Sequence, residues 1–112
     1  MVMYFYSKEN LPSKEVLPGI VLRSVYLPNT MITFFDLAAG SRIPAHKHPH
    51  EQISYLLKGR ITMTVGDETR TMQPGDIAVI PANVEHSVTV GDQPAVALDA
   101  WHPIRQDYVL DR

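Results

Sequence analysis

The chain has no cysteine among its 112 residues. Disulfide bonds, zinc-thiolate sites and thiol catalysis are therefore all excluded. The chain also lacks a surplus of positive charge, since 10 Lys and Arg residues stand against 12 Asp and Glu, for a formal net charge of -2. No basic field attracts a polyanion, so we expect no nucleic-acid partner.

Long apolar runs are also missing. The run at the start of the chain, residues 1–6 (MVMYFY), ends at Ser7, Lys8 and Glu9 and carries no preceding charge. A membrane-spanning helix needs about 20 apolar residues, and a signal peptide has a charged start and a longer apolar region. We therefore expect no membrane partner and a cytoplasmic location.

Turn signals are frequent and divide the chain into short apolar segments. A length of 112 residues suits one domain, so we expect a single domain over residues 1–112. The segments between turns are rich in Val, Ile, Thr and aromatic residues, which favour strands. Only residues 7–16 look helical, and Pro12 interrupts them. The pattern predicts an all-β sandwich or barrel whose turns are Pro28-Asn29, Gly40-Ser41, Lys58-Gly59, Gly66-Asp67, Pro74-Gly75-Asp76, Pro81-Ala82-Asn83 and Gly91-Asp92.

One of these turns indicates a hairpin. Residues 60–65 (RITMTV) alternate polar and apolar side chains with a period of two, as a half-buried strand does. The following Gly66-Asp67 is a two-residue connection with glycine first, which suits a tight hairpin turn. Residues 68–72 are the expected second strand.

Histidine is concentrated in one short segment, PAHKHPHEQ, at residues 44–52. His46 and His48 have the same parity, so in an extended segment both side chains leave from one face, about 6 to 7 Å apart at Cα. Both imidazoles can then reach one metal ion. Pro49 suggests a bend after His48, so we expect His50 to be a loop residue. A solvated strand edge remains the plain alternative for an isolated His-x-His pair, and a lone polar residue remains the alternative for His86.

The spacing of these residues resembles the two motifs of the cupin family. The first motif, Gly-x5-His-x-His-x3-4-Glu-x6-Gly, is matched by Gly40, His46, His48, Gln52 and Gly59. The second motif, Gly-x5-Pro-x-Gly-x2-His-x3-Asn, is matched at Gly75, Pro81 and His86, with Asn83 in place of Gly and Val90 in place of Asn. Asparagine tolerates the left-handed backbone that glycine supplies, so we expect the turn at Asn83 to persist.

The resemblance spans residues 40–90 and implies a double-stranded β-helix, the cupin jelly-roll barrel, with one divalent metal ion per chain. It implies that the metal ligands are His46, His48, Gln52 and His86. Gln52 stands where the family usually has glutamate, so the ligands bring no negative charge and favour Lewis-acid work over stabilising a higher oxidation state. Glu51 is the competing ligand, but it has the opposite parity. Imidazole and amide ligands accept Zn, Ni, Mn, Fe and Cu, so the metal stays open.

A second group of candidates lies in the last segment, ALDAWHPIRQDYVLDR. Asp99 and Trp101 share parity, and Arg105 follows Pro103. One interpretation is a structural Asp-Arg ion pair beside a core tryptophan. The other places an acid, an aromatic wall and a carboxylate-binding guanidinium at one mouth of the barrel, which suits an acidic sugar.

With the histidine segment, this tail resembles the pectin-degradation (KdgF-like) cupins. The resemblance implies ring opening of 4,5-unsaturated uronates to linear 4-deoxy-5-keto uronates in pectin and alginate breakdown. Asp99 would be the catalytic acid/base, Arg105 a catalytic and substrate-binding residue, and Trp101 a substrate-binding residue where phenylalanine is more familiar. Two other hypotheses remain: a metal-dependent oxygenase acting on a small phenolic or diketone substrate, and a sugar-binding cupin without catalysis.

The expected assembly is a homodimer. The apolar residues 1–6 and the strand expected at residues 20–27 carry more apolar surface than a small barrel needs. A second copy of the chain would cover part of it.

Overall fold

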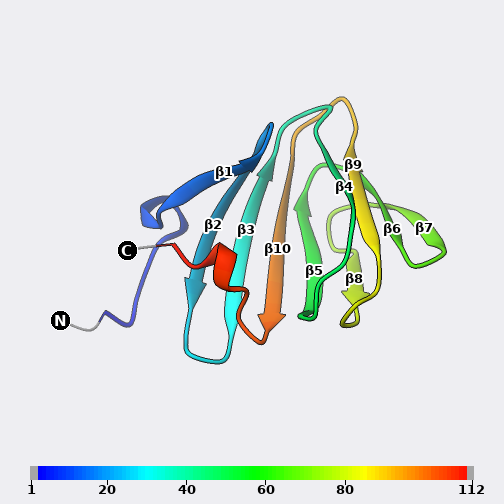
Figure 1. The fold of residues 1–112 in the computed structure, drawn as a ribbon. Helices are drawn as coiled ribbons and strands as arrows, with labels where there is room; N and C mark the ends of the chain where they lie inside the picture. The colour runs from blue at the N-terminus through cyan, green and yellow to red at the C-terminus, as the bar shows by residue number, and fades with distance from the viewer. Residues whose placement is uncertain (1–2, 111–112) are drawn as a thin grey trace.

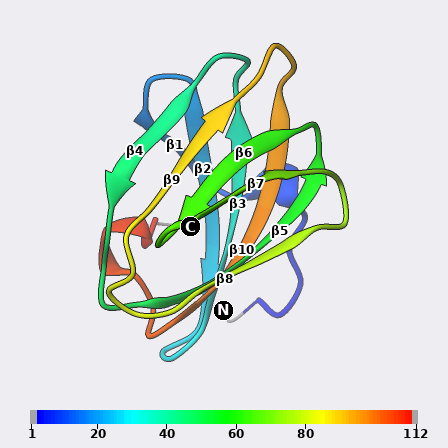
Figure 2. The ribbon, with the colours of Figure 1, turned by 90° about the vertical axis from the view of Figure 1, so that its right-hand side faces the viewer.

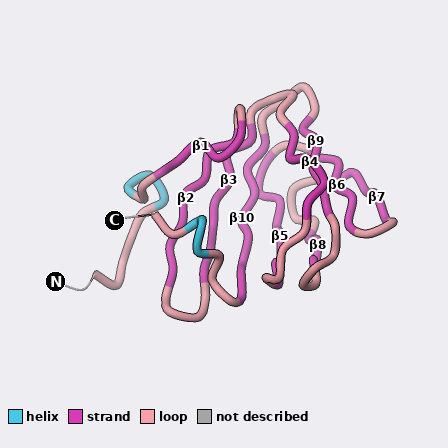
Figure 3. Tube along the Cα trace, in the orientation of Figure 1, coloured by secondary structure: helices cyan, strands magenta, loops and turns pink. Residues whose placement is uncertain are grey.

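The computed structural model describes residues 3–110, which form β-strands joined by short loops and two single-turn 3-10 helices (Figure 3). Neither of these helices could cross a membrane. In chain order the elements are η1 (Lys8–Asn10), β1 (Ser13–Leu17), β2 (Ile20–Tyr26), β3 (Met31–Leu37), β4 (Arg42–His46), β5 (Glu51–Lys58), β6 (Ile61–Val65), β7 (Glu68–Met72), β8 (Ile77–Ile80), β9 (His86–Val90), β10 (Ala95–His102) and η2 (Gln106–Tyr108).

The strands form two antiparallel sheets that face each other (Figures 1 and 2). The larger sheet has the order β1-β2-β3-β10-β5-β8, and the smaller one has the order β4-β9-β6-β7. The last strand, β10, lies between β3 and β5 and pairs with both. Such crossovers between distant segments are typical of a jelly roll. The all-β double-stranded β-helix that the motifs implied is confirmed.

The expected hairpin is present. Strands β6 and β7 pair from Ile61 opposite Met72 to Val65 opposite Glu68, on either side of Gly66-Asp67. Arg60 precedes the strand instead of beginning it. The first segment is less helical than residues 7–16 suggested, because Pro12 separates a single 3-10 turn from a strand that pairs with β2.

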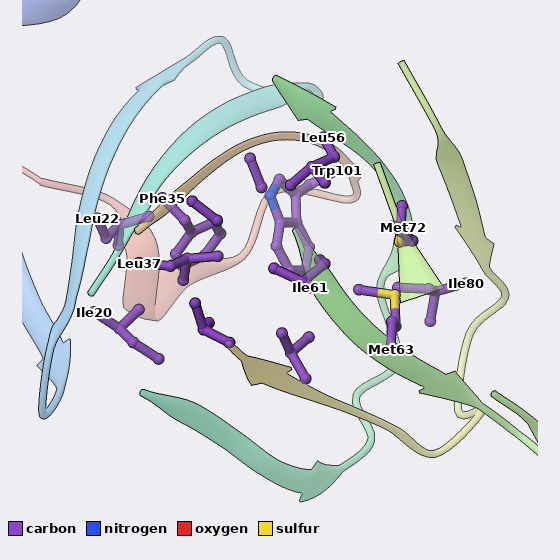
Figure 4. Close-up of a cluster of buried hydrophobic side chains, with 14 of the residues drawn as sticks. Ile20, Leu22, Phe35, Leu37, Leu56, Ile61, Met63, Met72, Ile80 and Trp101 are labelled. Atoms are coloured by element: carbon purple, nitrogen blue, oxygen red, sulfur yellow. The ribbon is translucent and has the colours of Figure 1, made fainter. Parts of the chain in front are cut away.

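Apolar side chains that alternate along the strands fill the space between the sheets. On β2, Ile20 and Leu22 are fully buried, and on β3 Phe35 and Leu37 point the same way (Figure 4). Trp101 enters this core from β10. Each fully buried side chain of this size contributes roughly 1.5 to 3 kcal/mol through removal from water. Burial of a polar side chain at one of the other inward positions costs free energy. The polar residues found there are therefore candidates for a functional site.

Candidate metal centre and the adjoining cavity

Three histidines converge between the sheets. His46 ends β4, His48 follows it in the connecting loop, and His86 begins β9 directly opposite His46 in the strand pairing. The ring centroids of His46 and His86 are 4.2 Å apart, and those of His48 and His86 are 4.8 Å apart. One ligand nitrogen from each ring lies within 4.8 Å of the other two. The common face expected for His46 and His48 is present, and His86 meets it across the β4-β9 ladder.

Each of these rings has its Nδ1 atom fixed by a backbone carbonyl. Nδ1 of His46 lies 2.8 Å from the Pro44 oxygen, Nδ1 of His48 lies 3.1 Å from the His50 oxygen, and Nδ1 of His86 lies 2.9 Å from the Val84 oxygen. A carbonyl only accepts hydrogen bonds, so each Nδ1 donates and each neutral ring keeps its lone pair on Nε2. Metal-binding histidines are oriented in this way.

Gln52 aims its oxygen at the same point. The Gln52 Nε2 atom donates a 2.6 Å hydrogen bond to Asp99 Oδ2, which leaves Oε1 only 3.0 Å from His48 Nε2. Two lone-pair atoms therefore face each other, and His86 Nε2 is buried with no hydrogen-bond partner among the described residues. Such a cluster of lone pairs is satisfied by a shared cation. The residues thus fit a divalent metal ion.

The protonation of the histidines supports this fit. Burial lowers the pKa of His86 from 6.5 to about 4. Burial and the nearby Arg105 charge also lower the pKa of His48. Both rings are therefore neutral at neutral pH, which is the form that binds metal.

The two motif segments are joined by a backbone contact. Asn83 has a φ of 65°, the left-handed conformation expected where the family usually has glycine. Its N–H donates a 2.7 Å hydrogen bond to the His48 oxygen. The turn at Asn83 therefore holds the loop that carries His48.

The neighbouring polar residues are arranged differently. His50 lies in the loop, as expected, and contributes its carbonyl oxygen to His48. Glu51 is exposed at the start of β5, whereas Gln52 is buried. Adjacent residues of a strand point to opposite faces, and as expected only Gln52 points inward.

Asp99 is buried behind Gln52 on the adjacent strand. It is 3% exposed and accepts hydrogen bonds from Gln52 Nε2 and from Ser54 Oγ, the latter at 2.8 Å. Burial raises its pKa from 3.8 to about 6, while both hydrogen bonds oppose that shift. A carboxyl group with such a pKa exchanges a proton readily near neutral pH.

A cavity of about 40 Å³ links this carboxyl group to the metal-ligand candidates. Its polar lining comes from both sheets and from the segment after β10, and apolar core side chains form the rest of its wall. The polar residues concerned are His46, Gln52, Ser54, His86, Asp99 and Arg105.

Trp101 is both a core residue and a wall of this site. It is 4% exposed, and its Nε1 atom donates a 2.8 Å hydrogen bond to Thr33 Oγ1. Its ring centroid also lies 5.3 Å from that of His48. The structural interpretation of Trp101 and the site interpretation are therefore compatible.

Arg105 takes a different ion-pair partner from the one considered in the structural interpretation. Its Nε atom lies 3.0 Å from Asp107 Oδ1, so Asp107 is the partner and Asp99 is bound by Gln52 and Ser54 instead. The guanidinium carbon lies 5.4 Å from the Trp101 ring centroid and 4.1 Å from that of Tyr108. Arg105 thus lies on aromatic rings beside the cavity.

Sequence reasoning missed two residues of this site. Ser54 has the same parity as Gln52 on β5, so the period of two could have identified it. Tyr108 lines the cavity and is brought back over Trp101 by the single turn of η2. No local pattern marks that return, because the turn packs on a ring from a different part of the chain.

Comparison with known proteins agrees with this geometry. Residues 33–101 match the family described as Cupin domain. The pectin degradation protein KdgF of Dickeya dadantii is 28% identical over 97% of this chain and 100% of that protein.

Two solved structures have the same architecture. KdgF from Halomonas sp. superposes with a TM-score of 0.88 at 25% identity, over 96% of this chain and 100% of that one. An RmlC-like cupin from Shewanella frigidimarina gives a TM-score of 0.89 at 21% identity, over 96% of this chain and 97% of the other. With the matched family region covering most of both sheets, this chain belongs to the cupin family.

Proposed function

We propose that this protein is a metal-dependent enzyme that opens 4,5-unsaturated uronates to linear 4-deoxy-5-keto uronates. The observation that carries the proposal is the direct hydrogen bond between Gln52 and Asp99, which joins a buried carboxyl group to a cluster of converging ligand atoms. Similarity along the whole chain to the Dickeya dadantii pectin degradation protein supports a role in pectin breakdown.

One divalent ion per chain would be held by Nε2 of His46, His48 and His86 and by Oε1 of Gln52. When bound, it supplies Lewis-acid chemistry, which makes a coordinated hydroxyl group a stronger acid. All four donors are neutral, so the set accepts Zn, Ni, Mn, Fe or Cu and gives no preference to a higher oxidation state.

Asp99 would move the proton. The ring opens when the hydroxyl group at C1 loses its proton and the bond between C1 and the ring oxygen breaks. The resulting enolate then takes a proton at C4 and becomes the 5-keto acid, so one proton is lost and one is gained, and the reaction is an isomerisation that consumes no water. Asp99 is the buried carboxylate among residues 3–110, and it lines the cavity at whose mouth both transfers would occur.

Arg105 and Trp101 would bind the substrate. The cavity of about 40 Å³ is far smaller than the roughly 300 Å³ or more of a small-molecule site, so the sugar ring must lie at its mouth. Arg105 is a partly exposed lining residue there and offers a bidentate partner for the uronate carboxylate. Trp101 contributes an apolar wall beside His48.

The proposal is tested with unsaturated galacturonate. The metal-loaded protein should remove the absorbance of the conjugated double bond near neutral pH, and NMR should identify the linear keto acid. Treatment with a chelator, or alanine at His46, His48 and His86 together, should stop the reaction. Full metal retention in that triple variant would show that the ion binds elsewhere.

The two other hypotheses have different outcomes in the same assay. An oxygenase would consume oxygen with a phenolic or diketone substrate, and a sugar-binding cupin would bind the uronate without turnover. The neutral Gln52 donor is less suited than a carboxylate to the oxidised metal of an oxygenase cycle. Ring opening is therefore the function we propose.

We also propose that the protein is a homodimer, with an interface that differs from the expected one. Ile20 and Leu22 of β2 are fully buried in the chain's own core, so that strand offers less apolar surface than expected. Of the apolar residues 1–6, the first two lie outside the described residues, and residues 3–6 form an exposed arm.

The apolar surface lies instead on the outer face of the larger sheet. Six large side chains there are 38% to 65% exposed: Ile32, Ile53, Tyr55, Leu57, Ile77 and Val79. They lie on β3, β5 and β8, and the strand pairing places Ile53 opposite Val79 and Tyr55 opposite Ile77. A groove beside the arm adjoins these rows. A two-fold pair would bury identical uncharged rows against each other and place each arm over the partner's groove.

A further inference from the structure

Arg105 is held on two sides by residues of the turn that follows it. Its Nε atom donates to both carboxylate oxygens of Asp107, at 3.0 and 3.3 Å. The ring of Tyr108 lies against the guanidinium, with its centroid 4.1 Å from the Arg105 carbon. The Tyr108 N–H donates a 2.9 Å hydrogen bond to the Arg105 oxygen, which closes the turn. The guanidinium is therefore fixed in position and in plane.

Tyr108 is itself anchored in the barrel. Its ring meets Phe35 edge-on at 5.9 Å and Trp101 at 5.5 Å. The support for Arg105 thus rests on core residues from β3 and β10. In contrast, the Asp107 side chain is 63% exposed, so it can be changed with little effect on packing.

We infer that Asp107 and Tyr108 are positioning residues, which orient Arg105 so that its Nη1 and Nη2 atoms grip the carboxylate of the substrate end-on. A guanidinium binds a carboxylate either through Nε and one Nη or through both Nη atoms. Because Asp107 occupies Nε, only the edge formed by both Nη atoms is left for a substrate carboxylate. This inference rests on the proposed function, since it assumes an acidic sugar.

Asp107 has a second effect that opposes the first. Its negative charge offsets that of Arg105, so its removal strengthens the attraction between Arg105 and a carboxylate. Asp107 is largely exposed, and water and salt weaken that charge effect. Orientation therefore dominates, and asparagine separates the two effects because it keeps a hydrogen-bond acceptor without the charge.

The test uses saturated galacturonate, which lacks the double bond, as a binding probe measured by calorimetry. Asp107→Ala should weaken binding about fivefold, the equivalent of one well-placed ion pair. Asp107→Asn should bind within about twofold of the parent or better. Tyr108→Leu, which removes the ring that lies against the guanidinium, should also bind more weakly than the parent. Galactose, which has no carboxylate, should bind to the parent and to all of these variants with the same affinity.

Glu68→Ala is the matched control. Glu68 and Arg70 form a 3.0 Å ion pair with the same spacing of two residues, but on β7 and outside the cavity lining. Its removal should leave galacturonate binding unchanged. Unchanged or tighter binding by Asp107→Ala would overturn the inference, as would absence of galacturonate binding by the parent protein.

Kinetics separate this inference from the proposed function. If unsaturated galacturonate is turned over, Asp107→Ala should raise KM about fivefold and leave kcat within about twofold. Turnover with an unchanged KM in Asp107→Ala contradicts the inference and leaves the proposed function standing. Galacturonate binding that follows the Asp107 and Tyr108 pattern, without turnover of the unsaturated sugar, contradicts the proposed function and leaves the inference standing.

Discussion

The Gln52 side chain donates a 2.6 Å hydrogen bond from Nε2 to Oδ2 of Asp99. This contact determines which way the amide faces, because a carboxylate cannot donate to the Gln52 oxygen. The oxygen is thereby directed toward His48, at 3.0 Å from Nε2. One hydrogen bond thus links the proposed acid/base to the geometry of the proposed metal ligands.

Replacement of Asp99 should separate these two effects. Asparagine can accept from Gln52 with its oxygen and donate to Ser54 with its amide, so Asp99→Asn should keep the fold and the metal. It cannot carry the proton, and its turnover of unsaturated galacturonate should fall about 100- to 10,000-fold. Asp99→Ala should in addition release Gln52 and weaken metal binding about 10-fold or more. Metal analysis measures the metal content, and the absorbance assay measures turnover. Turnover at the parent's rate in Asp99→Asn would rule out the proton role.

Arg105→Lys should affect substrate binding more than turnover. Lysine keeps the charge but loses the planar fork that fits a carboxylate with two hydrogen bonds. Steady-state kinetics should show a raised KM and a largely retained kcat. A fall in kcat with an unchanged KM would instead assign Arg105 to the chemical step.

Gln52→Glu should retain the metal and slow the reaction. The new carboxylate would lie against Asp99, where the present contact is 2.6 Å, and two carboxylates at that distance share a proton. Asp99 would then be a poorer base at neutral pH. Gln93→Glu, an exposed position, is the control and should behave like the parent. Equal activity of Gln52→Glu and the parent would show that the side chain at position 52 does not affect Asp99 during turnover.

Acid should destabilise the metal-free protein through His86. The unfolded chain binds a proton near pH 6.5, but the folded chain does so only near the lowered pKa of about 4. Between these values the unfolded state holds more protons, so the free energy of unfolding falls as pH drops from about 6.5 toward 4, by about 3 kcal/mol for this group.

Urea denaturation in chelator at pH 7 and pH 5 tests this effect, and over that interval the free energy of unfolding should fall by about 2 kcal/mol through His86. His86→Gln should reduce the pH dependence, and His102→Gln, at an exposed position, should retain it. Equal pH dependence in His86→Gln and the parent would contradict the assignment of this effect to His86.

In the metal-loaded protein, the metal should stay bound somewhat below pH 6.5, because burial keeps His48 and His86 neutral there.

Charge on the outer face of the larger sheet should break the proposed dimer. Ile53→Lys and Val79→Lys place ammonium groups in the paired apolar rows, at side chains 51% and 65% exposed. Sizing and light scattering at micromolar concentration should show a dimer for the parent and a monomer for both variants. Thr71→Lys, on the exposed side of β7, should remain dimeric. A monomeric parent would end the proposal.

Local patterns and motif spacing were enough to predict the architecture and the clustering of the histidines. Turn residues at short intervals and the period of two along residues 60–65 were enough to predict strands and a hairpin, because these signals depend on near neighbours. The parity of His46 and His48, and of Glu51 and Gln52, predicted which side chains point inward for the same reason.

The contacts that join these residues could be identified only in the folded chain. Gln52 and Asp99 are 47 positions apart, and β10 brings them together by entering between β3 and β5. The partner of Arg105 could not be read from charge pattern alone, since Asp99 and Asp107 are both close in sequence and the turn of η2 selects Asp107. The outer apolar rows likewise belong to strands that are neighbours in the sheet but distant in the chain. Contacts of this kind depend on strand order and register, which no local pattern encodes.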